Sequence, residues 1–324
     1  MLRYMIRRLL WAIVLFIAVT VVSYVLFFVI PADPAKQACG QACQQVDVER
    51  VRHFLHLDRP IYEQYGYFLW NLVVHQDLGR SFFNRESVNS LVADAAPVTA
   101  SLVFGGAVLW MMIGLSVGIF SALKPRSLID RSAMVFVLIG VSAHPIWIGL
   151  IFEYVFGVKL GWTPIANYAN FFGAPPDSGL PGGPWQWFYH LILPWCTFAL
   201  LFAALYVRMI RANVMETLNE DYVRTARAKG APEGQVIRSH VLRNALLPVV
   251  TMLGMDIGIA LGGAIFTETV YQLPGLGQTA IIGIGNQDLA IVQGVVVFAT
   301  LAIIVFNLIV DLLYAWIDPR IRLT

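Results

Sequence analysis

Long uncharged stretches dominate the pattern of hydrophobic and polar positions along the chain. The first runs for 22 residues from Leu9 to Ile30, directly after a head that carries Arg3, Arg7 and Arg8. A helix needs about 20 apolar residues to cross a hydrocarbon core of roughly 30 Å. The pattern therefore predicts six membrane-spanning helices, at about Leu9–Ile30, Val98–Leu123, Ala133–Phe156, Trp187–Val207, Ala245–Phe266 and Leu289–Val310.

The first stretch resembles a secretory signal peptide, because a basic head precedes an apolar run. The run is too long for a cleaved apolar core, so we expect a retained helix with a cytoplasmic N-terminus. Lys and Arg are enriched in the cytoplasmic loops of membrane proteins. Six spans would place both termini in the cytoplasm, together with 15 of the 22 Lys and Arg residues. Six of the other seven lie in one long outer loop, where the charge rule is weak.

Composition agrees with the hydropathy pattern. Hydrophobic residues make up 58% of the 324 residues and charged residues only 13%, and the mean hydropathy is +0.69. A soluble domain carries about 25% charged residues, so an ordinary soluble protein and a disordered one are both excluded. The net charge of +2 provides no argument for a nucleic-acid partner, and membrane lipid is the expected surrounding.

The chain divides into two parts. Residues 1–95 contain one span and a long outer segment, for which we expect a small element of short helices that contacts a binding protein or covers a cavity. Residues 96–318 contain five spans with short connections. The dipeptide His144-Pro145 interrupts the third span, where a proline kink is expected. Residues 271–288 are too apolar for a solvated loop and predict a turn followed by a short helix that dips toward the membrane.

The three cysteines lie in two settings. Cys39 and Cys43 are four residues apart in the outer loop, where an oxidising compartment would permit a disulfide, and two unpaired thiols are the alternative. Cys196 lies within a span and is interpreted as a small apolar residue. No further ligand groups accompany the two outer cysteines, so no metal site is expected.

The connection between the fourth and fifth spans, residues 208–244, predicts a short polar helix. Asn219 is a good N-cap and two acidic residues follow it, while Gly230 suits the end of the helix and Pro232 the start of another. We therefore expect about ten helical residues, a sharp turn and a second helix. Such a polar helix is either a solvated connector or a docking element for a partner protein.

The string D-Y-V-R-T-A-R-A-K-G at Asp221–Gly230, followed by R-N-A-L-L-P at Arg243–Pro248, resembles the loop of ABC-importer permeases. Further matches are D-L-G-R-S at Asp77–Ser81, L-P-G-L-G at Leu273–Gly277 and the ending at Asp311–Arg322. Together they resemble the B-type permease subunit of the dipeptide, oligopeptide and nickel importers. The resemblance implies an all-α integral membrane fold of the type I ABC importer permease kind. It has six transmembrane helices and a small helical extracytoplasmic segment between helices 1 and 2.

In that family the loop helix docks on a cytoplasmic ATPase, so the resemblance implies a coupling role for residues 219–232. It also implies a second homologous permease subunit, one or two ATP-binding subunits that hold ATP and Mg, and an extracytoplasmic substrate-binding protein, assembled at a bacterial cytoplasmic membrane. None of the four lysines follows a glycine, so this chain has no phosphate loop of its own. We expect it to bind no cofactor and to catalyse no reaction. The implied coupling residues are Asp221, Arg224, Thr225, Ala226, Arg227, Ala228, Lys229 and Gly230.

Acidic residues in the fifth span are candidates for the translocation pathway. A charge at this depth is costly and usually faces an interior or a cavity. Asp256, with Met255 beside it, is either a pathway-lining carboxylate or a packing group bonded to a neighbouring helix. Glu268, at the outer end of the span, either contacts the substrate or the binding protein or is a solvated interface acid.

Two other function classes compete with the importer. An ion-coupled transporter would use Asp256 and Glu268 without ATP, but it has no need of a docking helix in the cytoplasm. A serine hydrolase would use Ser116, in the G-x-S-x-G string of residues 114–118, with His144 or His190. That motif carries a nucleophile only at a strand-to-helix turn. Among importers, di- and oligopeptides are the expected cargo, and glutathione and nickel chelates are the alternatives.

Overall fold

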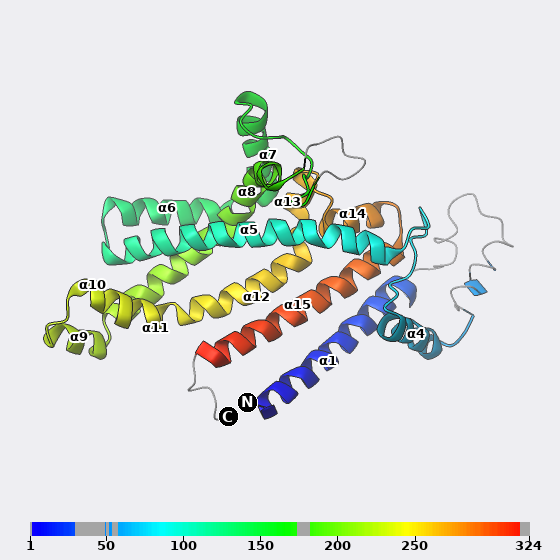
Figure 1. Ribbon diagram of the computed structural model, residues 1–324, viewed down its shortest axis with the longest axis horizontal. Helices are drawn as coiled ribbons and strands as arrows, with labels where there is room; N and C mark the ends of the chain where they lie inside the picture. The colour runs from blue at the N-terminus through cyan, green and yellow to red at the C-terminus, as the bar shows by residue number, and fades with distance from the viewer. Residues whose placement is uncertain (1, 30–48, 50–51, 54–57, 174–181, 318–324) are drawn as a thin grey trace. The chain divides into compact units, whose positions relative to one another are not determined.

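The computed structural model describes residues 2–29, 49, 52–53, 58–173 and 182–317, and over these it is helical without a β-strand. The first part contains α1 and the outer helix α4, and the remainder contains long helices with shorter helices between them (Figure 1). The α-helices are α1 (Leu2–Tyr24), α4 (Ile61–Trp70), α5 (Val88–Leu123), α6 (Leu128–Ser142), α7 (Pro145–Phe152), α8 (Pro184–Leu218), α9 (Asp221–Ala228), α10 (Glu233–Gln235), α11 (Arg243–Ala245), α12 (Leu247–Gly263), α13 (Ile265–Val270), α14 (Leu276–Gly285) and α15 (Leu289–Ile317). Four π-helical segments continue α1, α4, α7 and α10: η1 (Val25–Val29), η2 (Asn71–His75), η3 (Glu153–Lys159) and η4 (Val236–Leu242).

The long helices confirm the predicted membrane spans. Four helices are long and apolar enough to cross a bilayer by themselves, and two bent helix pairs bring the number to as many as six within the described residues. The chain is therefore a multi-pass membrane protein. The helices extend past the uncharged stretches that predicted them, because capping and packing carry a helix beyond its apolar residues. The four single helices are Ile6–Val29, Val88–Leu123, Pro184–Leu218 and Leu289–Val310.

The third predicted span breaks more sharply than a proline kink. Helix α6 meets the helix formed by α7 and η3 at an angle of 107°. Pro145 has no N–H to continue the ladder of α6, and it occupies the first turn of α7 instead. The ring Nδ1 of His144 accepts a hydrogen bond from the Ile146 N–H and caps the new helix. The expectation of one kinked helix was wrong here, because the dipeptide ends one helix and starts another.

The described chain forms two compact units. The first comprises residues 1–100, 261–269 and 274–324, and the second comprises residues 101–260 and 270–273. The α5 and α12 helices each contribute to both units. The division suggested by sequence, into residues 1–95 and 96–318, stays a prediction.

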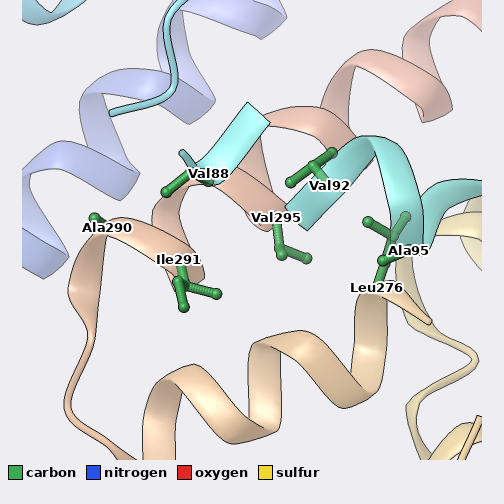
Figure 2. Packing of buried hydrophobic residues seen from close by; sticks show 7 residues of the cluster. All are labelled: Val88, Val92, Ala95, Leu276, Ala290, Ile291 and Val295. Atoms are coloured by element: carbon green, nitrogen blue, oxygen red, sulfur yellow. The ribbon is translucent and has the colours of Figure 1, made fainter. Parts of the chain in front are cut away.

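In the first unit α15 packs against both α1 and α14. Figure 2 shows the apolar contact at its centre, where side chains from the start of α5, from α14 and from α15 point toward one another. Gly294 permits this approach, since a Cβ atom at that position would collide with Val88. The cluster consists of Val88, Val92, Ala95, Leu276, Ala290, Ile291 and Val295.

In the second unit α8 is the central helix, and α6 packs along it. Small residues permit the close approach that drives helix packing in membranes. A Cβ atom at Gly140 of α6 would lie 2.7 Å from the Ala204 side chain of α8. Trp110 of α5 is fully buried and stacks on Phe202 with 4.5 Å between ring centroids. These contacts bury the middle of α8, where Ala204 and Val207 are fully buried.

The outer segment has the helical element that the sequence predicted, in the form of α4. After α4 and η2, a short loop is tied to the start of α15 by Asp288. The Asp288 carboxylate accepts hydrogen bonds from the Ser81 hydroxyl at 2.5 Å and from the Phe83 N–H at 3.1 Å. Cys39 and Cys43 lie outside the described residues. Cys196, within α8, is a free thiol.

Candidate functional site

A short polar helix, α9, lies in the connection between α8 and α12. It has eight residues, and Glu220 occupies its N-cap position. Asn219, which the sequence suggested as the N-cap, belongs to the end of α8, where its side-chain amide donates to the Met215 carbonyl at 2.9 Å. Asparagine can satisfy either helix end, and here α8 continues to the neighbouring Leu218, so Asn219 caps its C-terminus.

The turn after α9 has the predicted form. Gly230 has a φ of +78°, a backbone conformation that non-glycine side chains rarely adopt. The Ala231 N–H donates to the Ala226 carbonyl and closes the end of the helix. Pro232 is the N-cap of α10, which continues through η4 and α11 as the second helix. The expected helix, turn and helix are therefore confirmed, although α9 is two residues shorter than expected.

An ion pair joins the two sides of this turn. The Arg227 guanidinium donates to both carboxylate oxygens of Glu233, from Nε at 3.1 Å and from Nη2 at 2.7 Å. The bonds lower the pKa of the Glu233 carboxyl below its ordinary value. Both side chains are largely exposed, so the pair sets geometry more than it adds stability. It gives the turn a defined shape that neither residue would impose alone.

Two further contacts hold α9 against the segment that follows it. The Asn244 side-chain amide donates to the Tyr222 hydroxyl at 2.9 Å. Val223 is fully buried, as is Val236 in η4, on which α9 packs. A helix of eight residues is not stable alone in water, so these contacts are what keep α9 folded and oriented.

The residues that the resemblance assigned to coupling make up most of the exposed surface of α9 and the turn after it. Arg224, Arg227 and Lys229 provide its positive charge, and Arg224 lies 3.8 Å from the Asp221 carboxylate. All eight residues belong to α9 and the adjacent turn, and all are exposed apart from the half-buried Ala226. The structure thus brings the complete set together on one short helix and its turn.

The carboxylate of Asp256 has a partner that the sequence did not reveal. Asp256 lies in α12 and is partly buried, and the Tyr206 hydroxyl of α8 donates to its Oδ2 at 2.7 Å. Met255, next to it, is about half exposed. The structure therefore supports the interhelical hydrogen bond that was one of the two sequence interpretations. It also leaves part of the Asp256 side chain accessible.

Glu268, in α13 of the first unit, is fully buried. Its Oε1 accepts a hydrogen bond from the Thr99 hydroxyl at 2.6 Å, and its Oε2 accepts one from the Gln278 N–H at 3.0 Å. Thr99 in turn accepts from the Leu276 N–H at 2.8 Å. The carboxylate and Thr99 together satisfy N–H groups in the first turn of α14, a place where negative charge is favourable. Of the two sequence interpretations of Glu268, the solvated interface acid is wrong, because the carboxylate is a buried helix anchor.

The serine-hydrolase motif does not form a nucleophile turn. Ser116 lies inside α5, and its hydroxyl donates to the Met112 carbonyl at 2.6 Å, one turn earlier. Serine commonly makes this bond within a helix. The strand-to-helix turn that the motif requires is absent from the described part of the chain around Ser116.

Three residues of these sites escaped the sequence reasoning. Glu233 had one weak signal, its place directly after a helix-starting proline and close to Arg227. Tyr206 and Thr99 had none, because each is an ordinary residue of an apolar helix whose partner is distant in sequence.

Comparisons with known proteins agree over the whole chain. Residues 114–323 match the family described as the binding-protein-dependent transport system inner membrane component, and residues 1–103 match the N-terminal part of such membrane components. The chain is 37% identical to a di/tripeptide transport system permease of Pseudomonas aeruginosa (strain UCBPP-PA14), over 99% of each chain. It is 35% identical to a dipeptide transport system permease of Alkalihalophilus pseudofirmus, over 99% of this chain and all of the relative.

The fold also has a solved counterpart. A structure of the MetNI methionine ABC transporter in inward-facing conformations contains a chain that superposes with a TM-score of 0.54. The match covers 70% of this chain and 96% of that one, at 18% sequence identity. At this identity the likeness is evidence for the fold alone.

Proposed function

Because the chain belongs to the family of binding-protein-dependent transport system inner membrane components, we propose that it forms half of the translocation pathway of an ATP-driven importer for di- and oligopeptides. The observation that carries the proposal is the full-length similarity to two permeases named for dipeptide or di/tripeptide transport. Glutathione and nickel chelates are the alternative cargoes within the same family.

The surface formed by α9 and its turn is proposed to couple the spans to a cytoplasmic ATPase. Its support is physical: a charged, capped helix cannot lie in the hydrocarbon core, and the Arg227–Glu233 pair and the buried Val223 hold it as one body with the following segment. A movement of α9 would therefore be transmitted to α8 and α12 rather than be absorbed by a loop between them. ATP and Mg would be bound by the partner, since this chain has no phosphate loop.

The proposed assembly contains a second homologous permease, one or two ATP-binding subunits and an extracytoplasmic binding protein. The proposed location is the bacterial cytoplasmic membrane, with both termini in the cytoplasm. The distribution of Lys and Arg among the short loops supports this orientation. It places α9 on the ATPase side and α4 on the side of the binding protein.

For the pathway we propose Asp256 and the adjacent Met255. A partly exposed carboxylate at membrane depth is costly against lipid, so its accessible side is expected to face water, cargo or another polar surface. A pathway role for Glu268 stays a prediction. In the described conformation its carboxylate is occupied by Thr99 and Gln278, so such a role requires α14 to move.

The first test is a mild-detergent affinity purification of this chain from its native membrane, with mass spectrometry of the proteins that accompany it. Recovery of phosphate-loop ATPases and a second six-span chain supports the proposal. Recovery of the folded chain alone contradicts it and favours an ion-coupled transporter.

A paired substitution tests the coupling surface directly. Gly230→Leu forces a side chain into a positive-φ position, whereas Gly234→Leu places the same side chain in α10; neither site has an atom within 4 Å of an added Cβ. Gly230→Leu is expected to abolish uptake and the stimulation of ATP hydrolysis by the loaded binding protein, and Gly234→Leu to reduce them far less. Equal and normal uptake by both variants would count against coupling through this turn.

A further inference from the structure

The outer helix α4 and its continuation η2 carry a strip of exposed apolar side chains. Tyr62 and Trp70 in α4, and Val73 and Val74 in η2, are each more than half exposed. Tyr62, Gly66 and Trp70 are spaced four residues apart, so they lie along one side of the helix. A strip that contains an exposed tryptophan and two exposed valines is costly in water and calls for a covering surface.

The opposite side of α4 is fixed to α1. The Tyr24 hydroxyl of α1 donates to Oε1 of the buried Gln64 at 3.1 Å, and the Thr20 and Tyr65 hydroxyls are hydrogen-bonded at 3.0 Å. The rings of Tyr24 and Phe68 lie 5.5 Å apart. In Figure 1, α4 lies beside the C-terminal end of α1. These contacts determine the level of α4 along the axis of α1.

That level coincides with the boundary of the bilayer. The uncharged stretch of α1 and η1, Leu9–Val29, has 21 residues, which is about 32 Å of helix against a hydrocarbon core of about 30 Å. A centred stretch would extend about 1 Å beyond the core at each end. Tyr24 precedes Val29 by five residues, about 8 Å, and so lies about 7 Å inside the core. Interfacial helices are buried by a similar depth, about 5–10 Å.

A third side of α4 is polar. Glu63, Tyr67 and Asn71 are again four residues apart, next to the apolar strip. The Arg59 guanidinium donates to the Tyr67 hydroxyl at 2.7 Å and lies 3.7 Å from the Glu63 carboxylate. The helix therefore has an anchored side, an apolar side and a hydrogen-bonded polar side, which is the division expected of a helix at a membrane surface.

The helix to which α4 is fixed also carries exposed apolar side chains. On α1, Val22 and Leu26 are more than half exposed, as expected of a helix that faces lipid. We propose that the strip of Tyr62, Trp70, Val73 and Val74 is buried in lipid at the head-group boundary, in the leaflet at the C-terminal end of α1. Under the orientation proposed above this is the outer leaflet. Trp70 acts there as an interfacial anchor, since tryptophan is enriched at this depth.

The test uses the assembled transporter in phosphatidylcholine liposomes. A nitroxide label is attached at Val73→Cys or, as the matched control on the polar side, at Asn71→Cys, with Cys39, Cys43 and Cys196 replaced by serine. Collisions with oxygen, which concentrates in lipid, are compared with collisions with a water-soluble nickel chelate. The ratio of the collision rate with oxygen to the collision rate with the nickel chelate is expected to be higher at residue 73 than at residue 71. An equal ratio would mean that the strip faces water and would overturn the proposal.

Shielding of residue 73 from both reagents would also overturn it, because a protein surface would then cover the strip. A second measurement needs no cysteine background. Brominated phosphatidylcholine quenches tryptophans that touch acyl chains, and Trp70 is one of nine in the chain. Trp70→Phe is expected to reduce the quenched part of the fluorescence. An unchanged quenched part would show that Trp70 is not in lipid. The quenching experiment does not depend on which cargo the importer carries.

Discussion

The hydroxyl of Tyr206 donates a hydrogen bond to Oδ2 of Asp256, at 2.7 Å, and so joins α8 to α12 within the membrane-spanning part of the second unit. Tyr206 is fully buried, whereas Asp256 is only partly buried. One carboxylate oxygen is therefore held by the protein while the side chain keeps an accessible part. This arrangement separates a packing role from a pathway role, and the two can be measured apart.

Tyr206→Phe removes the donor and preserves the ring. Hydrogen bonds between membrane helices contribute about 0.6–2 kcal/mol, so we expect a lower thermal unfolding midpoint in detergent. Asp256→Asn keeps an oxygen that can accept from Tyr206, so its midpoint should stay close to that of the parent chain. Interactions with a charged group are worth about 1.5–3 kcal/mol, and uptake by Asp256→Asn should fall about tenfold or more. Undiminished uptake would leave Asp256 with the packing role alone.

Thr99 should stabilise the start of α14 more than its size suggests. Thr99→Val preserves shape but removes the donor to Glu268 and the acceptor for the Leu276 N–H. Leaving buried polar groups unsatisfied costs about 1–3 kcal/mol each. We expect a lower unfolding midpoint and faster hydrogen exchange of the amides in α14.

Thr279→Val provides the matched control for Thr99→Val. The Thr279 hydroxyl donates only to the Gly275 carbonyl one turn earlier, among the contacts described. Its removal should change the midpoint little. Equal effects of the two substitutions would mean that the contacts of Thr99 with Glu268 and Leu276 do not anchor α14.

Two glycines of the first unit should respond to alanine with opposite signs. At Gly294 a Cβ atom would collide with Val88, and overpacking costs about 1–3 kcal/mol. At Gly285 an added Cβ meets nothing within 4 Å, and alanine in a helix is favoured over glycine by about 0.5–1 kcal/mol. The thermal unfolding midpoint should therefore be lower for Gly294→Ala than for the parent chain, and it should not be lowered by Gly285→Ala. The reverse order would be inconsistent with the packing shown in Figure 2.

A charge exchange tests whether Arg227 acts through Glu233 or through the ATPase. Arg227→Glu replaces the ion pair with two carboxylates that repel each other across the turn. We therefore expect ATP-driven uptake to be lost. The double variant Arg227→Glu with Glu233→Arg restores an ion pair with reversed direction. Recovery of binding-protein-stimulated ATP hydrolysis in the double variant indicates that the pair shapes the turn. Failure to recover, with the complex still assembled, indicates that Arg227 itself contacts the partner.

Much of this architecture is readable from residue order alone, because its causes are local. The lengths of the uncharged stretches determined the membrane spans, since crossing lipid is a property of each segment by itself. Gly230 and Pro232 determined the end of one helix and the start of the next, through backbone conformations that few other residues adopt. The short motif around α9 was enough to suggest the permease family.

Only the tertiary structure decided what the buried polar groups do. Glu268 looked like an interface acid by sequence position, yet it is an anchor for α14, and Thr99, its partner, is 169 residues away. Tyr206 and Asp256 are separated by 50 residues. An apolar pattern predicts that a helix lies in a membrane, but it does not predict which residues of another helix will contact it. The partner of a buried hydrogen-bonding group is therefore set by packing across the fold, where local sequence carries no signal.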